Sequence, residues 1–284
     1  MANLKEIRIR ISSVSSTMQI TSAMKMVSAA KLKKAQDAIT AMRPYSNKLS
    51  ELMRGLSGAT EDKSFSQIRK LNKVLVIVIS SNRGLCGAFN ANVLKETINF
   101  RSRTEFKNAK VDFFTIGKKI NDSLSKTEKI IENESDLFDD LRYEKISIIV
   151  EKLMKFYLDQ EYDHIELIYN SFKNAATQIV RSEQFLPIIE NDKNNSDNFD
   201  YLFEPSQQAI VNTLIPKSLK MQLFKAVRDS FASEHGARMT AMHKATDNAS
   251  ELRDELKLTY NKARQASITN EILEIVGGAE ALNN

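Results

Sequence analysis

The feature that most constrains the fold is the absence of glycine and proline from residues 1–43. At about 1.5 Å per residue this run can form one unbroken helix of about 64 Å, much longer than the helices of ordinary globular domains. Its apolar residues recur at spacings of three and four, which is typical of a coiled-coil seam. They are Leu4, Ile7, Ile11, Val14 and Met18, followed by Leu32, Ala35, Ile39 and Met42. Because a helix with one apolar stripe needs a partner in water, we expect this segment to pair with another helix.

Between these two runs the apolar stripe changes phase. The same register would place Thr21, Lys25 and Ser28 in the seam. The apolar side chains shift instead to Ile20, Ala23, Met24, Val27 and Ala30. A phase change of this kind alters the local supercoil and turns a different face outwards, where a partner could grip the helix. Pro44 is then expected to kink or end the helix, and the glycines of residues 55–58 are expected to close the segment.

A second helical segment with the same spacing lies near the other end of the chain. Beyond Pro216 only Gly236 interrupts the pattern, which is expected to continue to Gly277 and Gly278. The stripe comprises Met242, Ala245, Ala249, Leu252, Leu256, Ala263 and Ala266, with Ile268, Ile272, Ile275 and Val276 after it. Two stripes on helices of similar length most simply pair with each other, and the alanines allow close approach. The sequence therefore predicts an antiparallel coiled coil made of the two ends of the chain.

The residues between these helices alternate between strand and helix patterns. Residues 74–79 are continuously apolar and β-branched, as in a strand that is covered on both faces. Further strands are predicted at residues 111–116, 164–169 and 176–189, helices at 91–103 and 143–160, and a polar loop at 191–200. We predict a Rossmann-like α/β head domain with a mostly parallel sheet, inserted between the two terminal helices. The expected boundaries are 1–56, 57–204 and 205–284.

Charge and cysteine content restrict the function classes. The formal charge of +5 is concentrated near the start, where residues 1–56 hold ten Lys or Arg against three acids. Such a basic helix is attracted to nucleic acid, anionic lipid and acidic protein surfaces alike. The sequence holds no run of eighteen apolar residues, so neither a membrane span nor a signal peptide is expected. Cys86 is the single cysteine, which excludes an intrachain disulfide and favours a reducing compartment.

Residues 80–90 form the segment whose pattern most suggests a ligand-binding or catalytic site. Gly84 and Gly87 follow a buried strand and precede a helix, which is the context of a phosphate-binding loop, and Arg83 would add charge. The segment lacks the Lys-Ser or Lys-Thr ending of a Walker loop and the three-glycine dinucleotide fingerprint. A tight turn whose glycines serve only backbone geometry is therefore the simpler interpretation. Cys86 within it is expected to be a buried, inert thiol.

Catalytic and metal sites are not expected. His235 and His243 lie eight residues apart, too far to share a tetrahedral metal without other ligands, and His164 falls in a predicted strand. Acidic residues are plentiful but do not form an isolated pair in an apolar setting of the kind that tunes a general acid. No cofactor and no enzymatic activity of the chain's own are therefore predicted.

Several motifs occur in order along the chain. They are Ile20-Thr-Ser-Ala-Met-Lys-Met-Val-Ser-Ala-Ala-Lys-Leu, Arg83-Gly-Leu-Cys-Gly, Tyr201-Leu-Phe-Glu-Pro, Ala232-Ser-Glu-His-Gly-Ala-Arg-Met, Ala245-Thr-Asp-Asn-Ala and Tyr260-Asn-Lys-Ala-Arg-Gln-Ala-Ser-Ile-Thr-Asn-Glu-Ile-Leu-Glu-Ile-Val. Together they resemble the gamma subunit family of rotary, F-type ATP synthases over nearly the whole chain. The chain departs from the family's common pattern in Asn82, where Asp usually stands, and in His235-Gly236, where Gln-Ala is frequent.

The resemblance implies a central rotor shaft that couples ion flow through a membrane ring to conformational change at catalytic sites on partner subunits, and that regulates ATPase activity. The implied partners are the alpha and beta subunits of the catalytic hexamer, the epsilon subunit and the proteolipid ring, with one copy of the shaft per complex and no nucleic acid. The inserted cysteine segment of chloroplast forms is absent, and the start matches without a transit extension. A bacterial protein, peripheral on the cytoplasmic face of the inner membrane, is implied.

The resemblance also assigns residues. Met24, Arg238, Gln265 and Thr269 match family positions that face the catalytic hexamer. Tyr201 and Glu204 match positions that face the ring. Together with the phase change, the first set is expected to give the shaft an uneven surface.

Two alternatives remain open at this stage. One is a basic coiled coil that binds nucleic acid, motivated by the pI near 9.1, although aromatic residues do not interleave with the basic ones. The other is a nucleotide-binding α/β enzyme that uses the turn between Gly84 and Gly87.

Overall fold

The computed structural model describes residues 4–56, 64–67, 69–107, 109–188, 204 and 206–283. The chain begins with helix α1 (Leu4–Leu56) and ends with helix α5 (Gln207–Asn283), and the remaining elements lie between them. The described residues pack as two compact units. The larger unit contains residues between 28 and 238, and the smaller contains those before 28 and after 238. Both long helices therefore contribute to each unit. The predicted polar loop at 191–200 and Tyr201 lie outside the described residues.

A five-stranded sheet in the order β3-β2-β1-β4-β5 is the centre of the larger unit. The strands are β1 (Lys73–Ile79), β2 (Lys110–Ile116), β3 (Ile130–Asn133), β4 (His164–Phe172) and β5 (Gln178–Leu186). The first four are parallel, and β5 runs antiparallel to β4. The predicted α/β head with a mostly parallel sheet is thus confirmed. Strand β3 was not predicted, because its four residues carry too few apolar side chains to give a strand pattern.

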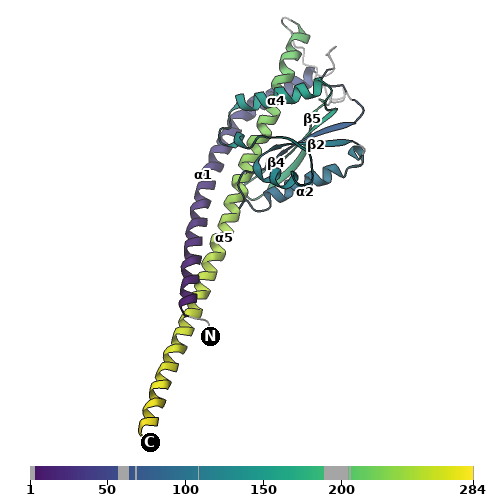
Figure 1. Cartoon of the computed structure of the whole chain (residues 1–284). Helices are drawn as coiled ribbons and strands as arrows, with labels where there is room; N and C mark the ends of the chain where they lie inside the picture. The colour runs from purple at the N-terminus through teal and green to yellow at the C-terminus, as the bar shows by residue number, and fades with distance from the viewer. Residues whose placement is uncertain are drawn as a thin grey trace. The chain divides into compact units, whose positions relative to one another are not determined.

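Helices cover both faces of this sheet (Figure 1). On one face Val74, Val76 and Val78 pack with α2 (Phe89–Arg101) and α3 (Lys118–Leu124). On the other face Leu75 and Ile77 pack with α4 (Tyr143–Leu158) and with the first turns of α5. Short 3-10 helices at Thr104–Phe106 and Ser135–Phe138 connect neighbouring elements. The continuous apolar run of β1 follows from this arrangement, since residues 74–79 are fully buried on both sides.

Both long helices continue through residues that normally interrupt helices. Pro44 lies inside α1, which does not end there but runs on to Leu56, and Pro216 lies inside α5. Helix α5 also continues through Gly277 and Gly278, where the sequence pattern was expected to stop. Around Pro44, Ile39 and Leu49 are buried, so packing on both sides offsets the one backbone hydrogen bond that proline removes. A Cβ added at Gly277 or Gly278 would meet no atom within 4 Å, so neither glycine is needed there for close packing.

The smaller unit is an antiparallel helix pair, as predicted (Figure 1). Arg8 donates to the Tyr260 hydroxyl at 2.7 Å. Arg253 contacts the sulfur of Met18, and one turn further along α1 Thr21 shares a hydrogen bond of 2.8 Å with Thr246. As the residue number increases along α1, the number of its contact residue in α5 decreases. The two helices are therefore antiparallel.

The phase change in α1 does not rotate the buried face. Thr21 and Ser28 remain in the seam, with 9% and 2% of their surface exposed, while Ile20, Met26 and Val27 face solvent with more than half of theirs exposed. Thr21 satisfies its hydroxyl at the seam with the Met18 carbonyl and with Thr246. Small hydroxyl side chains can be buried when they are hydrogen-bonded in this way. Of the displaced stripe, Ile20, Ala23, Val27 and Ala30 are therefore exposed, and Met24 is half-buried.

Candidate functional site

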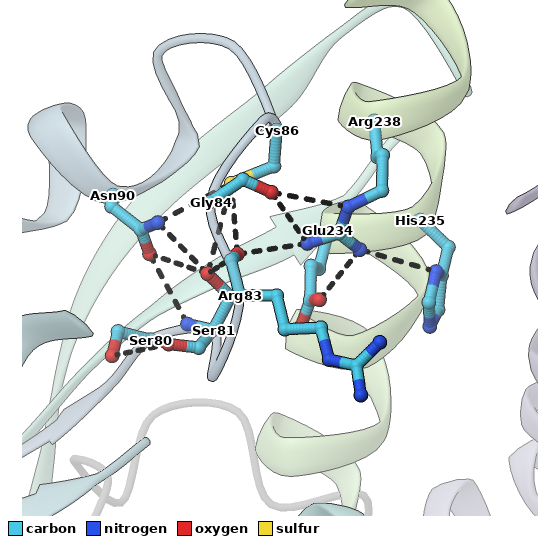
Figure 2. Close-up of polar contacts among 9 residues, drawn as sticks. All are labelled: Ser80, Ser81, Arg83, Gly84, Cys86, Asn90, Glu234, His235 and Arg238. Carbon is cyan, nitrogen blue, oxygen red and sulfur yellow. Dashed lines mark hydrogen bonds and ion pairs between the residues drawn. The ribbon is translucent and has the colours of Figure 1, made fainter. Parts of the chain in front are cut away.

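The loop after β1, residues 80–88, lies at the carboxyl edge of the sheet. Because β2 and β4 flank β1 on opposite sides, this is the switch point at which open α/β sheets usually bind ligands. Here the position is taken by α5, whose Arg238 and Glu234 side chains point towards the loop, while His235 lies on the far side of Arg238 (Figure 2). Ser233 of the same helix donates to the carbonyl of Asn170 near the end of β4 at 3.1 Å. The crevice is thus closed by the chain itself.

Arg238 anchors the loop to α5. Its guanidinium donates to the carbonyl of Arg83 at 2.9 Å and to that of Gly84 at 3.2 Å (Figure 2). The same group forms a 2.7 Å ion pair with Glu234, one helical turn earlier. Only 7% of Arg238 and 7% of Glu234 is exposed. A buried, planar guanidinium that satisfies two carbonyls and a carboxylate fixes the loop more firmly than a lysine could.

Polar side chains fill the inside of the loop. The backbone N–H of Ser81 donates to the Asn90 side-chain oxygen at 3.1 Å, and the Ser81 hydroxyl donates to the Arg83 carbonyl at 2.8 Å. The Asn90 amide donates to Sγ of Cys86 at 3.3 Å. Burial raises the pKa of the Cys86 thiol, so it stays protonated at neutral pH, in keeping with the expected inert role.

These contacts decide how the loop can act. Leu85 and Gly87 adopt positive φ angles of 62° and 59°, which turns the backbone tightly between Gly84 and helix α2. The carbonyls of Arg83 and Gly84 face the guanidinium, whereas a phosphate-binding loop presents N–H groups. The nearby Glu234 carboxylate would also repel an anion. The geometry therefore favours the tight-turn interpretation, with the side chain of Leu85 presented outwards.

His235 is a buried neutral base. Burial lowers its pKa to about 4, and the charges of Arg238 and Lys31 act in the same direction. Its Nδ1 lies 3.4 Å from the Arg238 guanidinium, and its ring packs edge-on against Phe231. The neighbouring Glu234 carboxyl has its pKa raised by burial, against the opposing effect of Arg238. Both shifts follow from the burial of these two side chains.

We predict that His235 makes the larger unit less stable in mild acid. Below pH 6.5, the ordinary pKa, the unfolded chain takes up a proton that the folded chain does not, so stability present above that pH is lost as pH falls towards about 4. Between pH 6.5 and about pH 5 the loss is about 1 to 2 kcal/mol. His235→Gln should flatten the dependence of the unfolding free energy on pH. His243→Gln, at an exposed site, should leave it unchanged; equal slopes for wild type and His235→Gln would refute the prediction.

Gly236 has a packing reason that the sequence did not reveal. A Cβ at this position would lie 3.2 Å from the backbone of Ala175, in the turn between β4 and β5. Glycine in a helix costs about 1 kcal/mol relative to alanine, and here that cost permits close approach of α5 to the sheet. The glycine at position 236, where alanine is frequent in the family, is therefore explained by the close packing of α5 against the turn between β4 and β5.

The residues that the sequence assigned to partner contacts do not form one cluster. Met24 is half-buried in the helix pair, and Gln265 and Thr269 are exposed on the last turns of α5. Arg238 belongs to the larger unit, where its guanidinium is already engaged. Glu204 is exposed. Sequence reasoning missed Asn90 and Glu234; the spacing of four between Glu234 and Arg238 was the available signal.

The far end of α5 carries exposed apolar side chains. Between 48% and 71% of each is exposed, and they are Ile268, Ile272, Leu273, Ile275 and Val276. Because Arg8 already meets Tyr260, these turns extend past the described part of α1. An exposed apolar helix end of this size is costly in water unless another molecule covers it. The end of α5 is therefore well suited to insert into an apolar cavity of a partner protein.

Searches of the described residues add two negative findings. None of the helices described is long and apolar enough to cross a membrane. No group of three or more His, Cys, Asp or Glu side chains placed to hold a metal ion occurs in the same part of the chain.

Comparison with known proteins agrees with this geometry. The sequence profile of the ATP synthase family matches residues 3–282. The ATP synthase gamma chain of Christiangramia forsetii is 62% identical, with all of both chains aligned. The chain belongs to the ATP synthase gamma chain family. The gamma chain of Flavobacterium johnsoniae, 65% identical, also aligns over the full length of both, and that of Flavobacterium psychrophilum is 66% identical over 99% of each.

Solved structures show the same fold. A chain from the Euglena gracilis mitochondrial ATP synthase, in a structure of its OSCP, F1 and c-ring parts, has a TM-score of 0.74 at 22% identity. That match covers 98% of this member of the gamma chain family and 94% of the Euglena chain. A second chain, from the rotor of the same synthase, has a TM-score of 0.68 at 23% identity and covers 93% and 98%. The fold that this chain shares with these structures thus includes both of its units.

Proposed function

We propose that this chain is the central stalk of an F-type ATP synthase, the shaft that turns inside a ring of catalytic subunits and couples ion flow to their conformational changes. Family membership and the exposed apolar end of α5 support this role most directly. The proposed partners are the alpha, beta and epsilon subunits and the membrane proteolipid ring, with one copy of the shaft per complex. ATP is made and hydrolysed on the partners, and the chain itself is non-catalytic. The proposed location is peripheral, on the cytoplasmic face of the bacterial inner membrane.

Asymmetry is what lets such a shaft act. A ligand or partner must distinguish two states by about 5.5 kcal/mol to shift a site from almost all open to almost all closed. A round shaft would favour no orientation. The helix pair is uneven, because Ile20, Met26 and Val27 face outwards on α1 while the seam beneath holds Thr21. As the shaft turns, different catalytic subunits meet this face.

Specific contacts follow for the assigned residues. Met24, Gln265 and Thr269 lie in the smaller unit, which we propose inserts into the hexamer. Arg238 is proposed to face the catalytic subunits through the Arg83–Gly84 backbone that its guanidinium fixes. Tyr201 and Glu204 are proposed to contact the ring. The proposed boundaries between the terminal helices and the head domain lie after residues 56 and 204. The alternative functions, nucleic-acid binding and nucleotide-dependent catalysis, gain no support from the family match or from the filled loop after β1.

We predict that replacing Met24, Gln265 and Thr269 together with alanine lowers ATP synthesis by the assembled complex about tenfold, since each change removes a contact that depends on orientation. ATP synthesis and hydrolysis are measured in membrane vesicles that contain the whole complex. Thr259→Ala with Gln19→Ala is the matched control, because Thr259 and Thr269 make the same hydroxyl bond to the carbonyl four residues earlier and all these sites but Met24 are exposed. Synthesis rates equal to the control would remove these residues from the mechanism.

A further inference from the structure

A cavity of about 390 Å³ lies in the larger unit between α1, the β4–β5 hairpin and α5. Its volume falls within the range of about 300 to 1,000 Å³ that is usual for small-molecule sites. It is lined on its apolar side by Ile39, Met42 and Phe172. The loop after β1 does not contribute to it.

Three cationic side chains from three different elements converge on this cavity. They are Arg43 of α1, Arg181 of β5 and Lys225 of α5. Arg181 lies 3.3 Å from Glu183, whereas neither Arg43 nor Lys225 has an acidic group within ion-pair distance among the described residues. The carboxylates of Asp229 and Glu183 offset two of these three positive charges, and the remaining positive charge attracts an anion. The arrangement therefore favours an anionic ligand.

One acidic side chain in the wall narrows the choice of anion. Asp229 is 9% exposed and accepts a hydrogen bond from the Ser171 hydroxyl at 3.3 Å. A fully deprotonated anion such as sulfate offers this carboxylate no hydrogen-bond donor and is repelled by it. The ion HPO₄²⁻ carries three acceptor oxygens for the cations and one P–OH that can donate to a carboxylate.

We propose that this cavity binds inorganic phosphate, with Arg43, Arg181 and Lys225 as donors to its oxygens and Asp229 as acceptor of its hydroxyl. Asn47, which also lines the cavity, can supply a further amide donor. Inorganic phosphate keeps its hydroxyl well above neutral pH, whereas phosphate esters lose theirs near pH 6. The site thus distinguishes free phosphate from a phosphate ester as well as from sulfate.

Titration calorimetry of the purified full-length chain at about pH 8 tests this proposal. The titrants are sodium phosphate, sodium sulfate and glycerol phosphate at equal ionic strength. We expect one saturable site for phosphate and binding at least about tenfold weaker for the other two. Arg43→Ala and Lys225→Ala, both at exposed side chains, should each weaken phosphate binding about tenfold. Lys126→Ala, which removes one exposed charge elsewhere in the same unit, should leave it unchanged.

Asp229→Asn should narrow the preference for phosphate over sulfate, because the amide carries no charge that repels sulfate and its NH₂ group can donate to a sulfate oxygen. No saturable phosphate binding, sulfate binding as tight as phosphate binding, or equal phosphate affinities in wild type and the Arg43→Ala and Lys225→Ala variants would each overturn the proposal. If Asp229→Asn does not fold, the Arg43 and Lys225 variants and the three titrants still decide it.

Discussion

Replacing Gly117 with alanine should destabilise the larger unit by at least about 3 kcal/mol. Gly117 follows β2 and adopts a φ of 110° and a ψ of 145°, a region that only glycine occupies readily. A Cβ there would lie 2.8 Å from the Ser80 carbonyl carbon and closer still to the Ser80 oxygen. Both atoms belong to backbone that is fixed by the bond from the Ser80 N–H to the Ile116 carbonyl, so neither can move away cheaply.

Amide hydrogen exchange in β1 and β2 measures this loss, because these central strands open only with the whole unit. Gly84→Ala is the matched control. Gly84 lies at the same edge of the sheet, and an added Cβ would meet only the flexible end of Lys119 at 3.9 Å. We expect its effect to stay within about 0.5 kcal/mol. Equal protection in Gly117→Ala and Gly84→Ala would contradict the account of this turn.

Replacing Arg238 with alanine should cost about 3 kcal/mol and release the loop after β1. The change leaves the Glu234 carboxyl buried without its partner and removes the donors to the Arg83 and Gly84 carbonyls. Removing one member of a buried pair is expensive because the remaining charge cannot reach water. The readouts are hydrogen exchange of residues 81–88 and the rate at which a protease cuts that loop.

The chain provides a close control for burial. Arg10 and Glu6 form an ion pair with the same spacing of four and the same 2.7 Å distance, but more than half of each side chain is exposed. Arg10→Ala should therefore cost less than about 0.5 kcal/mol. Arg238→Met combined with Glu234→Gln should recover part of the loss, since no charge is left unpaired. Equal costs for Arg238→Ala and Arg10→Ala would show that the anchor does not depend on burial.

The terminal helices and the sheet could be predicted because their signals are periodic and long. Residues 74–79 form a continuous apolar run, and the spacing of three and four extends over several turns at both ends. Strand β3 escaped prediction because it is short and sits at the sheet edge, where only half-burial is required. The continuation of α1 past Pro44 escaped it because burial of Ile39 and Leu49, a tertiary effect, overrides local propensity.

The candidate site was harder to predict than the fold. The sequence identified the segment around Gly84 and Gly87, but whether such a loop presents N–H groups or carbonyls depends on its partner across the unit. That partner, Arg238, is 154 residues away from Gly84. Family resemblance had assigned Arg238 to a contact with another subunit, whereas the fold gives its guanidinium an intramolecular role as well. Contacts between distant segments carry no local sequence signal, which is why the anchor became visible only in the folded chain.

The central claim is that this chain turns as a shaft within its complex. Single-molecule imaging of the assembled complex, with the catalytic hexamer fixed to a surface and a probe on Lys107→Cys, tests it most directly. Lys107 is exposed, and the native Cys86 is 2% exposed, so labelling of this chain before assembly is selective for the new thiol. The account predicts that the probe rotates in one direction when ATP is hydrolysed. Steady ATP hydrolysis by a labelled complex whose probe stays fixed would contradict it.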